Sequence, residues 1–164
     1  MNEIIQNNIY ENIVKLLNEA RKNVKKVIDT SMVYTYFEIG RLIVEEEQNG
    51  KERAEYGKNL IKNLSVKLTN EFGKGFSERN LANMKKFYIA YSILQKPSAK
   101  LNLSFSHYIM LSNILNVEER NFYEIETEKN NWSIPELRRQ IDSALYERLV
   151  LSRDKEEVKK LSIQ

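Results

Sequence analysis

Gly73 and Gly75 flank Lys74, and the backbone amides of this segment could surround a phosphate group. A Walker-type phosphate loop requires G-x-x-x-x-G-K-[ST] after a buried strand, and a dinucleotide-binding loop requires G-x-G-x-x-G. Here the glycines are two residues apart, the third position of the dinucleotide pattern falls on Glu78, and the preceding segment has a helical pattern. We therefore interpret Gly73 as the left-handed stop of one helix, Gly75 as a residue that relaxes the turn, and Ser77 as the N-cap of the next helix.

No other group of residues has a pattern typical of an active site. The single histidine, His107, has Ser104 and Ser106 nearby, but a Ser-His relay also requires an orienting acid and an oxyanion site. We interpret His107 as a hydrogen-bonded packing residue. Residues 157–159 match the E-x-K element of metal-dependent nucleases, but they belong to a charged helical tail and not to a strand. Three consecutive glutamates at 45–47 cannot share one helix face, so they do not form a metal site.

The absence of cysteine, together with the single histidine, excludes thiolate and histidine-rich metal sites. We therefore expect no catalytic residue, no metal and no cofactor, and we do not expect this chain to be an enzyme. The N-terminus lacks the basic start and unbroken apolar run of a signal peptide, and no stretch approaches the roughly 20 apolar residues that span a bilayer. These features predict a cytoplasmic protein without a membrane partner.

The elements that carry these residues are predicted to be helices throughout, because the chain has only five glycines and two prolines. We expect an all-α fold with a long N-terminal helix or helix pair, a central helix-turn-helix and a C-terminal helical subdomain. Asn116 with Glu119, and Ser133 with Glu136, are typical helix starts. The predicted helices span residues 3–49, 54–71, 77–93 with Ser77 as the N-cap, 105–115, 117–129, and 134 to 151 or later. The predicted regions, which form one compact domain, are 1–50 (long helical region), 51–94 (helix-turn-helix), 95–104 (linker) and 105–164 (C-terminal helical subdomain).

The helix after Ser77 has two different faces when it is drawn at 100° per residue. One face, for the core, has Ser77, Leu81, Met84, Tyr88 and Tyr91, with Phe87 near its edge. The opposite face has Arg79, Ala82, Asn83 and Lys86, a composition typical of a recognition helix in the major groove. The alternative is an ordinary solvated helix face. Under the first interpretation, the residues expected to contact DNA are Ser77, Arg79, Asn80, Asn83 and Lys86, with Lys58, Lys62, Lys74 and Lys85 as further phosphate contacts.

Positive charge is concentrated in the middle of the chain, although the formal net charge is only +3. Residues 51–100 have 11 Lys and Arg against 4 Asp and Glu, whereas the segments before and after are both slightly acidic. A basic central region favours a polyanionic partner such as a phosphate backbone. The alternative is that these lysines only solvate helices.

The N-terminal helical region has apolar residues at alternating steps of four and three, which is typical of a helix that packs along a partner helix. The regular pattern ends where polar Ser31 and Glu38 fall on it. This pattern supports an alternative function, a protein-interaction or dimerisation module. The residues of the pattern are Ile13, Leu17, Ala20, Val24 and Val27.

Residues 16–158 resemble the N-terminal domain of the YhcG-like family. The segments that carry the resemblance are EARKNVKKVIDTSMVYTYFEIGRLIVEEEQNG, YGKNLIKNLSVKLTNEFGKGFSERNLANMKKFY, LSFSHYIMLSNI and WSIPELRRQIDSALYERL. The resemblance implies a helical DNA-binding domain that precedes a PD-(D/E)XK nuclease domain in longer relatives. The catalytic residues of that nuclease domain have no matching positions in this chain, where the domain is absent.

The segments GFSERNLANMKKFY, LSFSHYIMLSNI and WSIPELRRQI are also similar, in order and spacing, to the helix-turn-helix region of ParB-type partition proteins. This similarity implies that the helix with Ser77, Arg79, Asn80, Asn83 and Lys86 lies on DNA. We therefore expect a non-catalytic domain that binds duplex DNA, with a homodimer as a further expected assembly.

Overall fold

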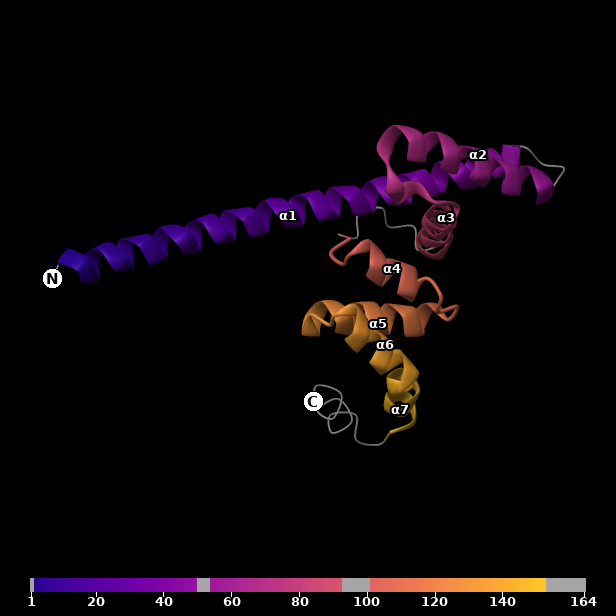
Figure 1. Ribbon diagram of the computed structural model, residues 1–164. Coiled ribbons are helices and arrows are strands. Elements are labelled where there is room, and N and C mark those ends of the chain that lie inside the picture. The colour runs from indigo at the N-terminus through magenta and orange to yellow at the C-terminus, as the bar shows by residue number, and fades with distance from the viewer. Residues whose placement is uncertain (1, 50–53, 93–100, 153–164) are drawn as a thin grey trace.

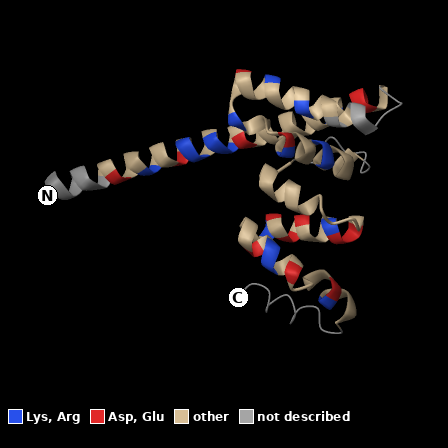
Figure 2. Cartoon of the chain, turned by 45° about the vertical axis from the view of Figure 1, so that its right-hand side comes forward, with Lys and Arg blue, Asp and Glu red and all other residues tan. Residues whose placement is uncertain are grey.

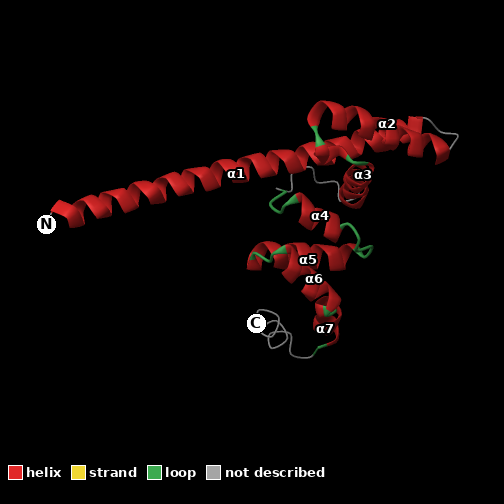
Figure 3. Cartoon of the chain, viewed as in Figure 1, coloured by secondary structure: helices red, strands yellow, loops and turns green. Residues whose placement is uncertain are grey.

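The computed structural model describes residues 2–49, 54–92 and 101–152, apart from the side chains of residues 2–8, 54–56 and 58. The described residues form helices and turns without a strand (Figure 3), so the predicted all-α class is confirmed. Gly50, which follows the predicted end of the first helix, and most of the predicted 95–104 linker lie outside the described residues. The elements are α1 (Asn2–Asn49), α2 (Ala54–Phe72), the 3₁₀ helix η1 (Lys74–Phe76), α3 (Glu78–Ser92), α4 (Phe105–Leu111), α5 (Val117–Asn130), α6 (Ile134–Asp142) and α7 (Leu145–Leu151).

The N-terminal region is one continuous helix, α1, and not two helices in line. Its 48 residues correspond to about 72 Å at 1.5 Å per residue. Its N-terminal half extends away from the rest of the molecule (Figure 1). We name residues 9–28 the arm; every arm residue is exposed except Val14, which is half-buried. Farther along the same helix, Val33 and Ile43 are each only 2% exposed, because Val33 packs against α3 and α4 and Ile43 packs against α2 and α3.

α3 packs against α1, α2 and α4, and so lies between the long helix and the C-terminal helices. It crosses α1, and in Figure 1 it is seen nearly end-on while α1 and α2 run across the view. Leu81 and Met84 of α3 pack with Ile43 of α1 and with half-buried apolar residues of α2. Phe87 is fully buried, so the expectation that it lies at the edge of the core face was wrong. The reason is that α4 covers this side of α3, and Phe87 packs there against Tyr108.

The C-terminal helices have a core of their own, which aromatic residues connect to α3. The rings of Phe87 and Tyr108 are stacked with centroids 4.9 Å apart, and Tyr91 approaches Tyr108 edge-on at 5.3 Å. These contacts join α3 to α4 and position the C-terminal subdomain. The buried residues of the C-terminal core are Leu111, Ile114, Tyr123, Trp132, Leu137, Leu145 and Leu149.

The helix predicted over residues 134–151 is divided in two, which corrects the prediction. α6 ends at Asp142, and Ala144 has a positive φ of 52° before α7 begins. The Tyr123 hydroxyl supplies hydrogen bonds at the break: it donates to the Gln140 carbonyl oxygen at 3.3 Å and accepts from the Tyr146 amide at 3.2 Å. The helix predicted over 105–115 also ends early, at Leu111, where the Ser112 hydroxyl donates to the Tyr108 carbonyl oxygen at 2.6 Å.

The two predicted helix starts are confirmed. The Asn116 side chain accepts hydrogen bonds from the amides of Glu118 and Glu119 at 2.9 and 3.1 Å. Ser133 and Glu136 form a capping box, in which the Glu136 carboxylate accepts from the Ser133 amide at 2.6 Å. Such caps satisfy backbone amides that have no partner within the helix, so they define where α5 and α6 begin.

Candidate nucleic-acid interface

The turn between α2 and α3 is fixed by its glycines and by two polar side chains. Gly73 has φ 89° and ψ −162°, so it has the expected positive φ but lies in an extended region open almost only to glycine, and not in the left-handed helical region. Its amide makes the last helical hydrogen bond of α2, to the Thr69 carbonyl oxygen at 3.0 Å, and the chain leaves the helix at Gly73. On the other side of the turn, the Ser77 hydroxyl accepts from the Asn80 amide at 3.3 Å, as its predicted N-cap role requires.

Asn80 has a structural role in this turn that the sequence pattern did not predict. Its side-chain nitrogen donates to the Gly75 carbonyl oxygen at 3.0 Å. Ser77 and Asn80 therefore both hold the turn that precedes α3. A signal for this role is present in the sequence, because an asparagine three residues after a serine cap can reach back to the turn.

A polar strip on the solvent side of α3 consists of Arg79, Ala82 and Asn83. Arg79 and Ala82 are exposed and Asn83 is half-buried. Residues three and four apart on a helix are neighbours, so Arg79, Ala82 and Asn83 form one continuous surface. Within the described part of the chain, the Arg79 guanidinium has neither a hydrogen bond nor an ion pair. A free guanidinium next to a small side chain and an amide can pair with a base edge or a phosphate.

The two lysines later in α3 already contact protein groups. Lys85 forms an ion pair with Glu47 of α1, with 2.5 Å between Nζ and Oε2. Lys86 Nζ donates to Oδ1 of Asn113, which lies just after α4, at 2.5 Å. Lys85 therefore has its charge neutralised by an acid, whereas Lys86 keeps its net charge because its partner is a neutral amide.

The remaining predicted phosphate contacts lie on α2 and in the turn. Lys62 and Lys74 are exposed, and neither has an ion pair with the residues that the structure describes. The Lys58 side chain lies outside the described residues. Figure 2 shows Lys and Arg on α2 and α3, whereas acidic residues are frequent on α5 below them. The unpaired cations near α3 are thus Arg79, Lys62 and Lys74, among the residues proposed from the sequence.

His107 is held on both sides by hydrogen bonds, as its predicted packing role requires. Its Nδ1 lies 2.7 Å from the Ser104 hydroxyl, and its Nε2 lies 3.0 Å from the Trp132 carbonyl oxygen. A carbonyl oxygen only accepts, so Nε2 must carry a proton, and in the neutral ring Nδ1 accepts from the serine. The imidazole therefore joins α4 to the turn before α6.

The glutamates at 45–47 do not converge on a cation. Glu45 pairs with Arg41 at 2.8 Å, and Glu47 pairs with Lys85. Within the described ranges, no group of three or more His, Cys, Asp or Glu side chains is placed to hold a metal ion. The E-x-K element at 157–159 lies outside the described residues. Among those residues, no helix is both long and apolar enough to cross a membrane.

Comparison with known proteins decides the family. The DUF1016 N-terminal domain matches residues 12–148, which is most of the chain. The chain belongs to the DUF1016 N-terminal domain family. A relative from Escherichia coli (strain K12), named "Putative nuclease YhcG", is 37% identical over 177 residues, an alignment that covers 90% of this chain. The expected membership of the YhcG-like family is thereby confirmed.

This DUF1016 N-terminal domain spans about half the length of that relative, since the alignment covers 47% of the E. coli protein. No solved structure matches the chain. The proposals about its surfaces therefore rest on the geometry of this domain alone.

The DUF1016 domain also contains a buried polar contact that no sequence motif indicates. The guanidinium carbon of Arg120 lies 5.3 Å from the ring centroid of Tyr91, and Arg120 Nη1 donates to the Ile114 carbonyl oxygen at 3.1 Å. Burial raises the pKa of Tyr91 and, to a lesser degree, the nearby carboxylate of Glu124 does so too. Burial also raises the pKa of Glu124. These contacts join the C-terminal end of α3 to α5. Tyr91 and Arg120 are far apart in the sequence, so no local pattern predicts that they meet.

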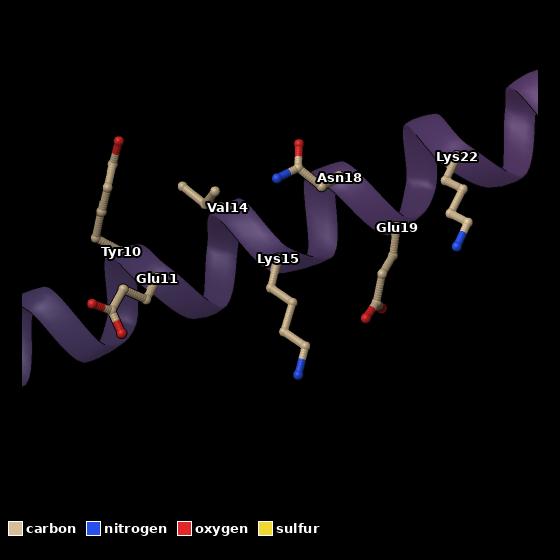
Figure 4. Close-up of a pocket in the computed structure, with 7 residues that line it drawn as sticks. All are labelled: Tyr10, Glu11, Val14, Lys15, Asn18, Glu19 and Lys22. Carbon is tan, nitrogen blue, oxygen red and sulfur yellow. The ribbon is translucent and has the colours of Figure 1, made fainter. Parts of the chain in front are cut away.

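The arm of the DUF1016 domain has a shallow depression along its side (Figure 4). Every residue that lines it belongs to α1, so the depression is a groove on a single helix with no opposite wall. An enclosed small-molecule site would need groups from several elements. The lining residues are Tyr10, Glu11, Val14, Lys15, Asn18, Glu19 and Lys22.

Proposed function

We propose that this chain is a non-catalytic DNA-binding domain that contacts duplex DNA through α3 and the turn before it, used as a helix-turn-helix. The observation that carries the proposal is the free Arg79 guanidinium on the solvent face of α3, in line with exposed Ala82 and with Asn83. Arginine pairs with guanine and asparagine with adenine, and a small residue between them lets the helix lie deep in the groove.

The charge distribution supports the same interface. α3 belongs to the basic central part of the chain, and Lys62 and Lys74 are exposed there. Such lysines bind phosphates and position the helix without reading the sequence. Lys86 has its ammonium group directed by Asn113, which leaves a cation at the far end of the strip. Lys85 is expected to contribute only when its ion pair with Glu47 opens.

The relative named as a nuclease supports a nucleic-acid partner for this domain. It also suggests that DNA binding and DNA cleavage belong to different parts of the longer proteins. In longer relatives, we propose, this domain brings DNA to a nuclease module in the remaining part of the protein. The domain itself performs no catalysis in this proposal. A DNA-binding role also implies a cytoplasmic location. The direct test is an anisotropy titration with fluorescent duplex DNA, in which Arg79→Ala must weaken binding.

A second proposed role is self-association through the arm. The observation that favours it is the row of exposed apolar side chains on a helix segment that no other described element covers. Helix-turn-helix proteins commonly bind DNA as dimers, so the two roles are compatible. Light scattering tests this role, because a homodimer has twice the 19.4 kDa mass of one chain.

A further inference from the structure

The arm presents to solvent an apolar seam of the kind that two paired helices bury between them. Its members alternate steps of three and four residues, and this period of 3.5 keeps a seam in contact with a partner helix. The large apolar side chains of the arm are 51% to 69% exposed. Single exposed apolar residues are common, but a continuous row marks an interaction surface. The seam consists of Tyr10, Ile13, Leu17, Ala20, Val24 and Val27, flanked by Ile9, Leu16 and Ile28.

The arm has an acidic N-terminal half and a basic C-terminal half, and this distribution favours one orientation of a second, paired arm. Residues 2–19 contain three glutamates and one lysine, whereas residues 20–29 contain three lysines, one arginine and one aspartate. Two parallel copies would place the two basic halves side by side. Two antiparallel copies place the acidic half of each arm beside the basic half of the other, and this replaces repulsion with attraction.

Side-chain size favours the same direction. In an antiparallel pair centred between Asn18 and Glu19, Leu17 faces the partner's Ala20, and Tyr10 faces the partner's Val27. Each layer then combines a large residue with a smaller one, as dense packing requires. A parallel pair would instead place Ala20 against Ala20 and leave a gap, and it would place Tyr10 against Tyr10 and crowd the seam.

We infer that the occupant of this seam is a second copy of the chain, and that the two arms pair antiparallel. This inference rests on the proposed self-association and adds its geometry. The groove in Figure 4, which includes Tyr10 and Val14, flanks the seam and would take side chains from the edge of the partner helix.

The antiparallel pair separates the two α3 helices by a predictable distance. Gly40, where α3 crosses α1, is 21 to 22 residues from the centre of the pair, which corresponds to roughly 32 Å along the helix. The two crossing points are then roughly 65 Å apart, close to two turns of B-DNA. A parallel pair would bring the two α3 helices next to each other.

The absence of cysteine makes a direct test possible. Ile13→Cys and Val24→Cys change two exposed arm residues, so neither disturbs the core. The two variants, one of them with a size tag, are mixed at micromolar concentration and treated with a short bismaleimide. The antiparallel pair predicts that most cross-linked product joins the thiol at position 13 of one chain to the thiol at position 24 of another. The two thiols at position 13 would lie roughly 16 Å apart, which is too far for a short linker.

Like-with-like products, 13 to 13 and 24 to 24, would overturn the antiparallel arrangement while leaving self-association intact. A monomer mass for the unmodified chain together with no cross-linked product would overturn self-association itself. Circular dichroism on each variant confirms that α1 is still helical. The experiment contains no DNA, so its outcome is independent of whether the domain binds DNA.

Discussion

A Cβ atom placed on Gly40 of α1 would overlap the carbonyl oxygen of Met84 on α3. It would also lie 2.9 Å from Cβ of Tyr88. The backbones of α1 and α3 therefore touch at this point, and only glycine allows the approach. Because the proposed DNA interface lies on α3, the contact between Gly40 and Met84 fixes the position of that interface relative to α1.

Gly40→Ala is expected to destabilise the domain by about 1–3 kcal/mol or more, because the methyl group meets backbone and not a flexible side chain. Alanine normally stabilises a helix relative to glycine by up to about 1 kcal/mol. A lower free energy of unfolding for Gly40→Ala would therefore show that the close contact with α3 outweighs helix propensity. Urea denaturation measures it. The matched control is Gly75→Ala, where an added Cβ has no neighbour within 4 Å. An unchanged or raised free energy of unfolding for Gly40→Ala would show that the helices do not touch here.

Glu47→Gln is expected to tighten DNA binding by a few-fold, because it removes an acid that neutralises Lys85 and frees the ammonium group for phosphate. The salt dependence of binding should become steeper at the same time. Glu38→Gln is the control, since Glu38 pairs with Arg41 at 2.8 Å and not with a residue of α3. If Glu47→Gln and Glu38→Gln bind DNA equally well, Lys85 does not belong to the interface.

His107→Ala is expected to lower the free energy of unfolding by roughly 1–3 kcal/mol, because it removes both hydrogen bonds that join α4 to the Trp132 carbonyl and Ser104. DNA affinity, measured at a temperature where the variant is folded, should not change. Ser104→Ala removes only one of these bonds and should have the smaller effect. A loss of DNA affinity without a loss of stability would instead assign His107 to the interface.

The capping box of α6 predicts a pH-dependent contribution to stability. Hydrogen bonds from the Ser133 side chain and amide hold the pKa of Glu136 below its ordinary value. An acid with a lowered pKa in the folded state stabilises the fold above its unfolded pKa, and this contribution is lost as the pH falls through the folded value. Glu136→Gln should therefore have a lower urea midpoint than the unmodified chain at neutral pH, and the gap should close at an acid pH below the folded pKa of Glu136. An equal gap at both pH values would mean that the carboxylate charge is not what stabilises the cap.

Features set by local chemistry could be predicted from the sequence. The Asn116 and Ser133 starts and the turn at Gly73 depend on a few neighbouring residues, so they were located correctly. The family could be predicted as well, because the motifs that resemble it extend along most of the chain.

Features set by contacts between distant residues could not be predicted. The break between α6 and α7 depends on the Tyr123 hydroxyl of α5, and the central position of Phe87 depends on α4. At the candidate site, the same limit applies to Lys85 and Lys86, whose partners Glu47 and Asn113 lie in other elements. Periodicity placed Lys86 on the face opposite the core, where it is exposed, but it could not show what either lysine contacts.

The measurement that tests the central claim most directly is an anisotropy titration of duplex DNA with the unmodified chain and with Arg79→Ala, at several salt concentrations. The control is Arg138→Ala, which removes an exposed arginine from α6. We predict that affinity falls steeply as salt rises, because bound phosphates release counterions. We also predict that Arg79→Ala weakens binding by about 1–3 kcal/mol with little change in stability, whereas Arg138→Ala binds as the unmodified chain does. Absence of binding at low salt, binding that is indifferent to salt, or equal affinities for the two arginine variants would contradict the account.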